Sequence, residues 1–455
     1  MTAIAETRPE RPKRGFVAIC VSLFERWMPD PFVIAIVLTL ATGLAAFVLA
    51  PNGKPDVIIT SWYAGIFKIL TFAFQMILIL VAGHALANAP PIKRAIVAIV
   101  SIAKTPNQAV VLTFLVCAAA AFLNWGFGLV IAAMVSREMA KRMRIDFGWI
   151  VAAAYSGWMV WATGFSSSIA LTQATKGSDL NIIEKVTGHV TPFGDMVFKA
   201  WNIVPTALVV ILVPIMFILI RPRDEDVVAF EPPPEAAVAG KPDRGGQDAP
   251  ARRADRWPWF AWALSAAGFA YVAYVWITKG PTIDINLVIF VFLMLGLALH
   301  ASPIAYVRAV DNAASQVGAM ILQYPIYGGI MGILTTTGLA GVISKAFVAI
   351  ASAHTLPFWS YICSLFITML VPSGGGHWAV QGPFVVPAAV QLGASPAAVA
   401  IAVAAGESVA YMLQPFFALP VVAIAGIGIQ RVMGYTVVTF MLTCAIWIGA
   451  TLLLM

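Results

Sequence analysis

The sequence predicts an all-α polytopic membrane protein, and three observations support this prediction. Of its 455 residues, 60% are hydrophobic and only 11% are charged, and the mean hydropathy is +0.88. Apolar runs of about 20 residues, the length at which a helix crosses a hydrocarbon core, recur along the chain. Several runs are interrupted near their middle by glycine, proline, serine or asparagine. Non-helical backbone at membrane depth survives only where protein or a water-filled cavity satisfies its polar groups, so each interruption is a candidate site.

The same composition excludes several other classes of protein. A formal net charge of +7 in so apolar a chain is loop charge that sets membrane orientation, and we expect a lipid bilayer and no nucleic acid as partner. The four cysteines lie singly in apolar runs, at Cys20, Cys117, Cys363 and Cys444. This spacing favours neither a disulfide framework nor a zinc site, so we expect no cofactor and no metal other than Na⁺.

The first part of the chain predicts a short leading segment and a first transmembrane repeat. Residues 1–30 are interpreted as a cytoplasmic or interfacial segment, because the apolar run 16–23 is short and lacks a signal-peptide cleavage site. The first repeat is predicted at 31–220. Its spans are expected at 31–50, 66–87, 147–171 and 196–220, with a loop at 51–63 and an interfacial helix at 92–103.

A re-entrant hairpin is predicted inside this first repeat. Residues 107–134 are apolar but interrupted at Asn124, Gly126 and Gly128. The span that follows carries Thr163 and a run of three serines at 166–168. Serine and threonine side chains compete for helix backbone groups, so we expect this second element to be a broken helix.

Residues 221–256 separate the two halves. This stretch is rich in proline, glycine, alanine and both signs of charge, and it has no apolar period. It predicts a disordered cytoplasmic linker, since it cannot bury enough apolar surface to order itself. The second repeat is then predicted at 257–455, with spans at 257–277, 285–299, 317–341, 396–420 and from 435, and an interfacial piece at 342–353.

The central stretch of the second repeat is residues 371–387, VPSGGGHWAVQGPFVVP. Three consecutive glycines are a poor helix interior, and Pro383 has no amide hydrogen to donate. We therefore predict a second re-entrant hairpin with an open Ser/Gly tip. The span after it is expected to break at Gln414, next to a proline.

Charge supports opposite orientations for the two hairpins. With a cytoplasmic N-terminus, and with each hairpin returning to the side from which it came, 7 lysines of the 28 Lys+Arg fall outside. The other 21 (28 − 7), including all 16 arginines, are cytoplasmic. A shift of 249 residues aligns Asn124 with Ser373 and Gly126 with Gly375, although identity over that window is near chance. The shared order of elements predicts two inverted repeats, an arrangement common in secondary transporters.

The interruptions supply the candidate substrate site. Helix N-termini carry partial positive charge and free amides, and no lysine or arginine lies in the middle of a predicted span. A bound anion would therefore be held by amides, hydroxyls, amide side chains or a co-bound cation. The candidate substrate-binding residues are Ser373, Gly374, Gly375, Gly376, His377, Trp378, Gln381, Asn124, Gly126 and Gln414.

A second set of residues is the candidate site for a coupling ion, Na⁺ or H⁺. Glu407 lies within a span, where an ionised carboxylate is costly; it is a cation ligand, a proton carrier or a partner for another polar group. His377 likewise suits a proton carrier, a substrate donor or an interhelical hydrogen bond. The coupling-ion candidates are Glu407, Thr163, Ser166, Ser167 and Ser168.

The motif VPSGGGHWAVQGPFVVPAA closely resembles the short-chain fatty acid transporter family (AtoE type), and the segments QPFFALP (414–420) and WMPDP (27–31) are similar to two further blocks of that family. The resemblance implies a secondary carrier, not an enzyme, that imports butyrate-like or acetoacetate-like monocarboxylates across the bacterial cytoplasmic (inner) membrane. It also implies the ion-transporter superfamily fold and a homodimer. The chain departs from the family at Glu407, where aspartate is expected, and at Ala410 and Tyr411, where Thr-Asn is usual.

Other functions remain open at this stage. A dicarboxylate or bare-ion exchanger of the same superfamily is the alternative within transport. An intramembrane hydrolase would use Ser373 and His377, which lie four residues apart, but no third orienting group is evident. A channel is the last alternative, although hairpins opening to opposite sides suit alternating access better.

The predicted linker gives a first test. Replacing residues 232–251 by a Gly/Ser linker of equal length should leave uptake of substrate almost unchanged, because the stretch has few large apolar residues to lose. Uptake per molecule of protein in the membrane measures this. Loss of transport at normal expression would show that the segment has a specific role.

Overall fold

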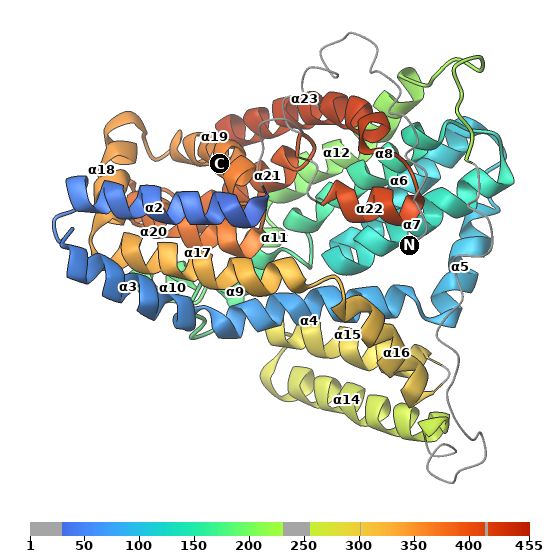
Figure 1. Ribbon diagram of the computed structural model, residues 1–455, viewed down its shortest axis with the longest axis horizontal. Helices are drawn as coiled ribbons and strands as arrows, with labels where there is room; N and C mark the ends of the chain where they lie inside the picture. The colour runs from blue at the N-terminus through green and yellow to red at the C-terminus, as the bar shows by residue number, and fades with distance from the viewer. Residues whose placement is uncertain (1–29, 231–254, 301, 415–416) are drawn as a thin grey trace, which may run out of the picture.

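The structure is a computed structural model that describes residues 30–230, 255–300, 302–414 and 417–455 (Figure 1). Within these ranges the regular elements are helices, which confirms the predicted all-α class. The predicted N-terminal segment, apart from Asp30, and residues 231–254 of the predicted linker lie outside the described residues.

The first half consists of eleven α-helices and one 3-10 helix in the described ranges. In order they are α2 (Pro31–Leu49), α3 (Pro55–Lys68), α4 (Leu70–Ala87), α5 (Pro90–Val100), α6 (Pro106–Leu123), α7 (Trp125–Arg142), α8 (Phe147–Trp158), η1 (Met159–Thr163), α9 (Ser168–Ala174), α10 (Ile182–Thr187), α11 (Gly194–Val197) and α12 (Ala200–Leu219).

The second half consists of ten α-helices in the described ranges. They are α14 (Pro258–Lys279), α15 (Ile285–Leu299), α16 (Pro303–Ala314), α17 (Gly318–Thr336), α18 (Leu339–Ile350), α19 (Leu356–Leu370), α20 (Gly374–Leu392), α21 (Pro396–Ala410), α22 (Ala418–Ala425) and α23 (Ile429–Leu453).

The described helices include six that are long and apolar enough to cross a membrane, or seven if the bent pair α17 and α18 counts as one span. That pair bends by 74° at Gly338, whose φ of +83° is a conformation that glycine adopts without strain. The multi-span membrane class predicted from hydropathy is therefore confirmed.

Several predicted boundaries are wrong. Most of the predicted loop 51–63 is helical, because Pro55 occupies the first turn of α3, where its missing amide hydrogen is not needed, and Asp56 follows it. α3 and α4 then run on through a single residue, Ile69. Helix α16 was not predicted, and α23 begins at Ile429 rather than near 435.

Both predicted hairpins are helix–turn–helix units. α6 and α7 meet at Asn124 alone, and they pack so closely that a Cβ on Gly128 would approach Ala121. α19 and α20 are separated by residues 371–373. Each unit is followed by a broken helix, α8–η1–α9 in the first half and α21–α22 in the second. This order matches the predicted repeat, and its inverted orientation in a membrane stays a prediction.

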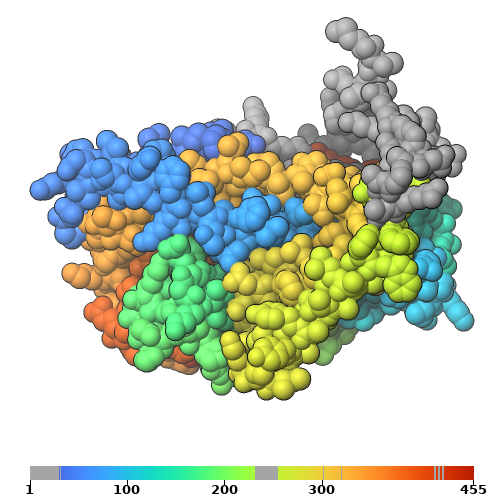
Figure 2. All heavy atoms as spheres, turned by 90° about the horizontal axis from the view of Figure 1, so that it is seen from below, coloured from blue at the N-terminus to red at the C-terminus, as the bar shows by residue number. Residues whose placement is uncertain are grey.

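Helices α14 and α15 form an arm at the side of the bundle, next to α4 (Figure 1). Figure 2 shows α14 on the same face as the green first-half segment near residue 190. Two hydrogen bonds join the arm: Trp262 Nε1 donates to the Ala298 carbonyl at 3.2 Å, and Ser265 Oγ donates to the Met294 carbonyl at 3.1 Å. Such bonds stabilise helix pairs where no water competes.

The described beginning of the predicted linker has definite contacts. The amide of Phe147 donates to the Val228 carbonyl at 3.0 Å, and the amide of Val228 donates to Asp146 Oδ2 at 3.1 Å. The ring of Phe230 lies 4.7 Å from that of Phe147. Residues 228–230 therefore lie along the start of α8. The composition of the predicted linker did not reveal this contact, which depends on the packing of Phe230 against Phe147.

Helices α3 and α17 pack through small residues. Ser61 and Gly65 lie four apart on α3, and Gly328 and Gly332 lie four apart on α17. A Cβ on Gly65 would meet the Gly328 backbone, and a Cβ on Gly332 would meet the Ser61 carbonyl. Side-chain-free contacts of this kind let two membrane helices approach at backbone distance.

This packing gives a prediction for stability. Gly332→Ala should lower the thermal unfolding midpoint of the purified protein, since the new methyl overlaps the Ser61 carbonyl and overpacking costs about 1–3 kcal/mol. Gly318→Ala is the matched control on the same helix, because a Cβ at Gly318 meets nothing within 4 Å. An equal midpoint for both variants would contradict the close α3–α17 contact.

Candidate functional site

The helix breaks of the two halves meet around one small cavity. Its lining includes Ser373, Gly374 and Gly375 at the start of α20 and Ser168 at the start of α9. The other lining residues are Met76, Trp125, Trp158, Trp161, Met320, Gln323, Tyr324, Pro372 and Phe417. The cavity has a volume of about 30 Å³. A cavity of that size holds about two water molecules.

Ser373 begins helix α20. Its backbone is extended (φ −159°, ψ 118°), and its Oγ accepts a hydrogen bond from the Gly376 amide at 3.3 Å. The three glycines are therefore the first turn of a helix, and the prediction that they form an open tip is wrong. The non-helical residues are instead 371–373. Glycine is tolerated at these positions because the first amides of a helix make no intrahelical hydrogen bonds, and the Ser373 side chain caps one of them.

Each of the three glycines faces a different neighbour. A Cβ on Gly374 would meet Ser168 Oγ, Trp161 Cη2 and Glu407 Oε1. A Cβ on Gly375 would meet the ring of Phe72, and one on Gly376 the ring of Tyr327. None of the three has a positive φ. The run is thus explained by close approach on three sides of the helix, and not by a special backbone conformation.

Hydrogen-bond donors without partners gather at this point. Ser168 Oγ and Trp161 Nε1 are buried and lack a partner among the described residues. The amides of Gly374 and Gly375 open α20, where a helix has no carbonyl to offer them. Tyr324, whose hydroxyl is a further donor, also lines the cavity. Donors at a helix N-terminus suit a carboxylate, whose oxygens are acceptors only.

Glu407 lies beside this donor group and not in the cavity wall. Its Oε1 accepts a hydrogen bond from the Tyr411 hydroxyl at 2.5 Å, and its buried Oε2 has no partner in the described chain. Oε1 would be 3.1 Å from a Cβ on Gly374. In the described ranges no three His, Cys, Asp or Glu side chains gather as a metal site.

His377 and Gln381 hold the second hairpin together. His377 Nδ1 is 3.0 Å from Thr368 Oγ1, and its Nε2 is 2.6 Å from Gln381 Oε1. Gln381 Nε2 donates to the Ser360 carbonyl at 2.8 Å. Both side chains are fully buried against α19. They contact α19 and not the cavity, so the interhelical interpretation of His377 is the one that the contacts favour.

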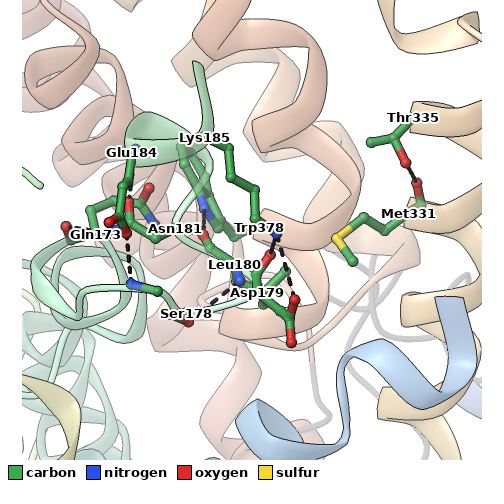
Figure 3. Close-up of polar contacts among 11 residues, drawn as sticks. Gln173, Ser178, Asp179, Leu180, Asn181, Glu184, Lys185, Met331, Thr335 and Trp378 are labelled. Atoms are coloured by element: carbon green, nitrogen blue, oxygen red, sulfur yellow. Dashed lines mark hydrogen bonds and ion pairs between the residues drawn. The ribbon is translucent and has the colours of Figure 1, made fainter. Parts of the chain in front are cut away.

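Trp378 ties α20 to the first half of the chain (Figure 3). Its Nε1 donates to the Leu180 carbonyl at 3.0 Å, in a segment that Gln173 and Asn181 brace through further hydrogen bonds. Lys185 lies in the same segment; burial and the charge of Lys68 lower its pKa, whereas the contact between Lys185 and Asp179 raises it. Trp378 thus fixes the position of α20 and does not line the cavity.

Three more substrate candidates lie outside the cavity wall. Asn124 caps α7 by accepting from the Phe127 amide at 2.9 Å, and its Nδ2 donates to the Ile79 carbonyl at 3.3 Å. A Cβ on Gly126 would meet the backbone of Leu80, so this glycine allows α7 to pack on α4. Gln414 Nε2 donates to the Thr368 carbonyl at 3.3 Å, and its buried Oε1 lacks a partner among the described residues.

The hydroxyls of the remaining coupling-ion candidates are already used in hydrogen bonds within the broken helix or to neighbouring helices. Ser166 Oγ donates to the Ala121 carbonyl at 2.7 Å, and Ser167 Oγ caps α9 by accepting from the Ala170 amide. Thr163 Oγ1 donates to the Val160 carbonyl and accepts from Thr206. Of the predicted set, Ser168 and Glu407 are therefore brought together across Gly374, and the others are not.

Sequence reasoning missed the contribution of α4 and α17. Met76, Met320, Gln323 and Tyr324 all line the cavity. The signal was present but weak: Gln323 and Tyr324 directly precede Pro325 inside an apolar run. A polar pair next to a proline in a membrane helix marks a place where backbone groups need other partners.

The comparisons with known proteins agree on one kind of protein. The sequence profile described as short chain fatty acid transporter matches residues 14–454. Two curated proteins described as candidate short-chain fatty acid transporters are similar over most of their length. One, from Escherichia coli K12, is 39% identical over 94% of this chain and 97% of its own; the other, from Haemophilus influenzae, is 36% identical over 93% and 96%.

Two solved structures share the fold at low identity. The YdaH transporter of Alcanivorax borkumensis matches with a TM-score of 0.61 and 15% identity, over 93% of this chain and 98% of that one. MtrF of Neisseria gonorrhoeae, assigned to a class of antimetabolite efflux pumps, matches with a TM-score of 0.54 and 15% identity over 97% of both chains. At this identity the likeness concerns the fold alone.

The packing of Gly375 gives a prediction for the site. Gly375→Ala should abolish substrate uptake, because the added methyl overlaps the Phe72 ring and displaces the first turn of α20. Combining it with Phe72→Leu should restore part of the uptake by opening that contact. Gly341→Ala is the matched control, since a Cβ there meets nothing within 4 Å. Full uptake by Gly375→Ala alone would place the site elsewhere.

Proposed function

The chain belongs to the short-chain fatty acid transporter family, and we propose that it imports short-chain monocarboxylates such as butyrate or acetoacetate by symport with a cation. The family is one of transporters and not of enzymes. We propose the bacterial cytoplasmic (inner) membrane as its location, with a cytoplasmic N-terminus and a homodimeric assembly; the arginine distribution and the family resemblance support these assignments.

The observation that carries the substrate proposal is the set of donors around the first turn of α20. Ser168 Oγ and Trp161 Nε1 are buried without partners among the described residues. Both side chains lie next to Gly374, at the end of α20 where its first amides are free. A buried donor left unpaired costs about 1–3 kcal/mol, so a bound carboxylate that accepts from them regains that energy. The aromatic and methionine side chains in the rest of the wall suit a short apolar tail.

The lining also favours one carboxylate over two. The described residues that line the cavity include no lysine or arginine. One carboxylate can be held by amides and hydroxyls at a helix N-terminus, whereas a second would be buried without a partner. A dicarboxylate is therefore the weaker substrate proposal.

Coupling follows from the charge of the substrate. Moving one anion inward against a negative interior is opposed by about 2.3 kcal/mol per 100 mV, so a cation, Na⁺ or H⁺, should accompany it. Glu407 is the proposed coupling residue. Its Oε2 is buried without a partner, and the residue lies next to Gly374 and Ser168.

Uptake into proteoliposomes tests this function. Labelled butyrate should accumulate in vesicles containing the protein when a Na⁺ or a pH gradient is imposed, and Glu407→Gln should lose this accumulation while remaining folded. Protein-free vesicles correct for the undissociated acid that crosses lipid unaided. Glu138→Gln, which removes a carboxylate paired with Lys141 at the surface, is the matched control. Unaltered accumulation by Glu407→Gln would assign this residue a structural role.

A further inference from the structure

Two side chains from α4 and α17 meet at the tip of α20. Phe72 of α4 and Tyr324 of α17 are in edge-to-face contact, with ring centroids 5.9 Å apart. Phe72 lies against Gly375, and Tyr324 lines the cavity together with Ser373. This aromatic pair therefore marks the level of the proposed carboxylate site.

Each of the two helices carries a methionine one turn away from its aromatic residue. Met76 is four residues after Phe72, and Met320 is four residues before Tyr324, so each lies on the same helix face as its aromatic partner. Both methionines line the cavity. One helical turn rises about 5.4 Å, which is close to the length of an extended chain of about five carbon atoms, whose four bonds of about 1.5 Å each advance about 1.25 Å.

Another part of the cavity wall is built of side chains that are held in place. Trp158 Nε1 donates to the Trp125 carbonyl at 2.9 Å, and the Trp158 ring stacks on Tyr155 at 5.6 Å. Methionine has an unbranched side chain with three rotatable bonds, so it adapts to what enters. Since the cavity holds only about two water molecules, an acyl tail needs such side chains to move aside.

We propose that Met76 and Met320 determine the longest acyl chain that the transporter accepts. The carboxylate binds at the first turn of α20, and the tail runs along the contact between α4 and α17 until it reaches the two methionines. This inference rests on the proposed function, because it takes a monocarboxylate as the substrate. It assigns specificity to two helices that the glycine motif does not include.

Competition binding measures the effect. The full chain, purified in detergent, is loaded with labelled butyrate, and acetate, butyrate, hexanoate and octanoate are titrated as competitors. Met320→Ala and Met76→Ala should each raise the affinity for hexanoate relative to butyrate. Each additional methylene that the opened space buries should contribute about 0.8 kcal/mol, or about fourfold. Met76 is almost fully buried, so Met76→Val provides a milder second variant if the alanine form does not fold.

The controls separate specificity from general damage. Met331 is a buried methionine of α17 that does not line the cavity (Figure 3). Met331→Ala should therefore leave the ratio of the affinities for hexanoate and butyrate unchanged. Met320→Leu, which conserves volume, should also keep the wild-type ratio. An unchanged ratio in folded Met320→Ala and Met76→Val would overturn the inference, as would an equal shift in Met331→Ala. Failure of the wild-type protein to bind any of the four acids would instead reject the proposed function.

Discussion

The constraint on which the site depends is that polar backbone groups far from water must find partners. Where a helix breaks inside a bundle, its first amides remain free unless a side chain or a ligand satisfies them. The described chain meets this need with short polar caps: Ser373 at α20, Asn124 at α7 and Ser167 at α9. The caps use most of the available hydroxyl and amide groups. Among the buried polar atoms that lack a partner in the described chain, those of Ser168, Trp161 and Glu407 belong to side chains that gather around Gly374, and they define the place for a ligand.

Most of the glycine motif positions the site and does not form its wall. Gly375 and Gly376 admit the rings of Phe72 and Tyr327, His377 and Gln381 bind α19, and Trp378 binds the 173–185 segment of the first half. Of the motif, Pro372, Ser373, Gly374 and Gly375 line the cavity. The first turns of α20 are thus held by neighbouring helices on several sides. Because the segment bonded to Trp378 belongs to the first half of the chain, these contacts bring the two halves together at one site. The α4–α17 pair adds the adaptable side of that site.

Prediction from sequence succeeded where the signal was local. Hydropathy and length revealed most of the spans, and glycine, serine and asparagine revealed both hairpins and the break in the 147–171 span. It failed for short segments that mix polar and apolar residues, as at the start of α3 and for α16. It also placed the three glycines outside a helix, because propensity disfavours glycine within helices, whereas close packing at a capped first turn favours it.

The sequence by itself determined the class of the protein, the family to which it belongs and the positions where helices break. Each of these follows from residue types that are close together in the chain. The tertiary structure decided which polar residues face the cavity: it brought Ser168 and Glu407 together across Gly374 and turned Asn124, His377 and Gln381 to other helices. A side chain's partner depends on which helices pack beside it, and contacts between residues on different helices leave no pattern in a single sequence.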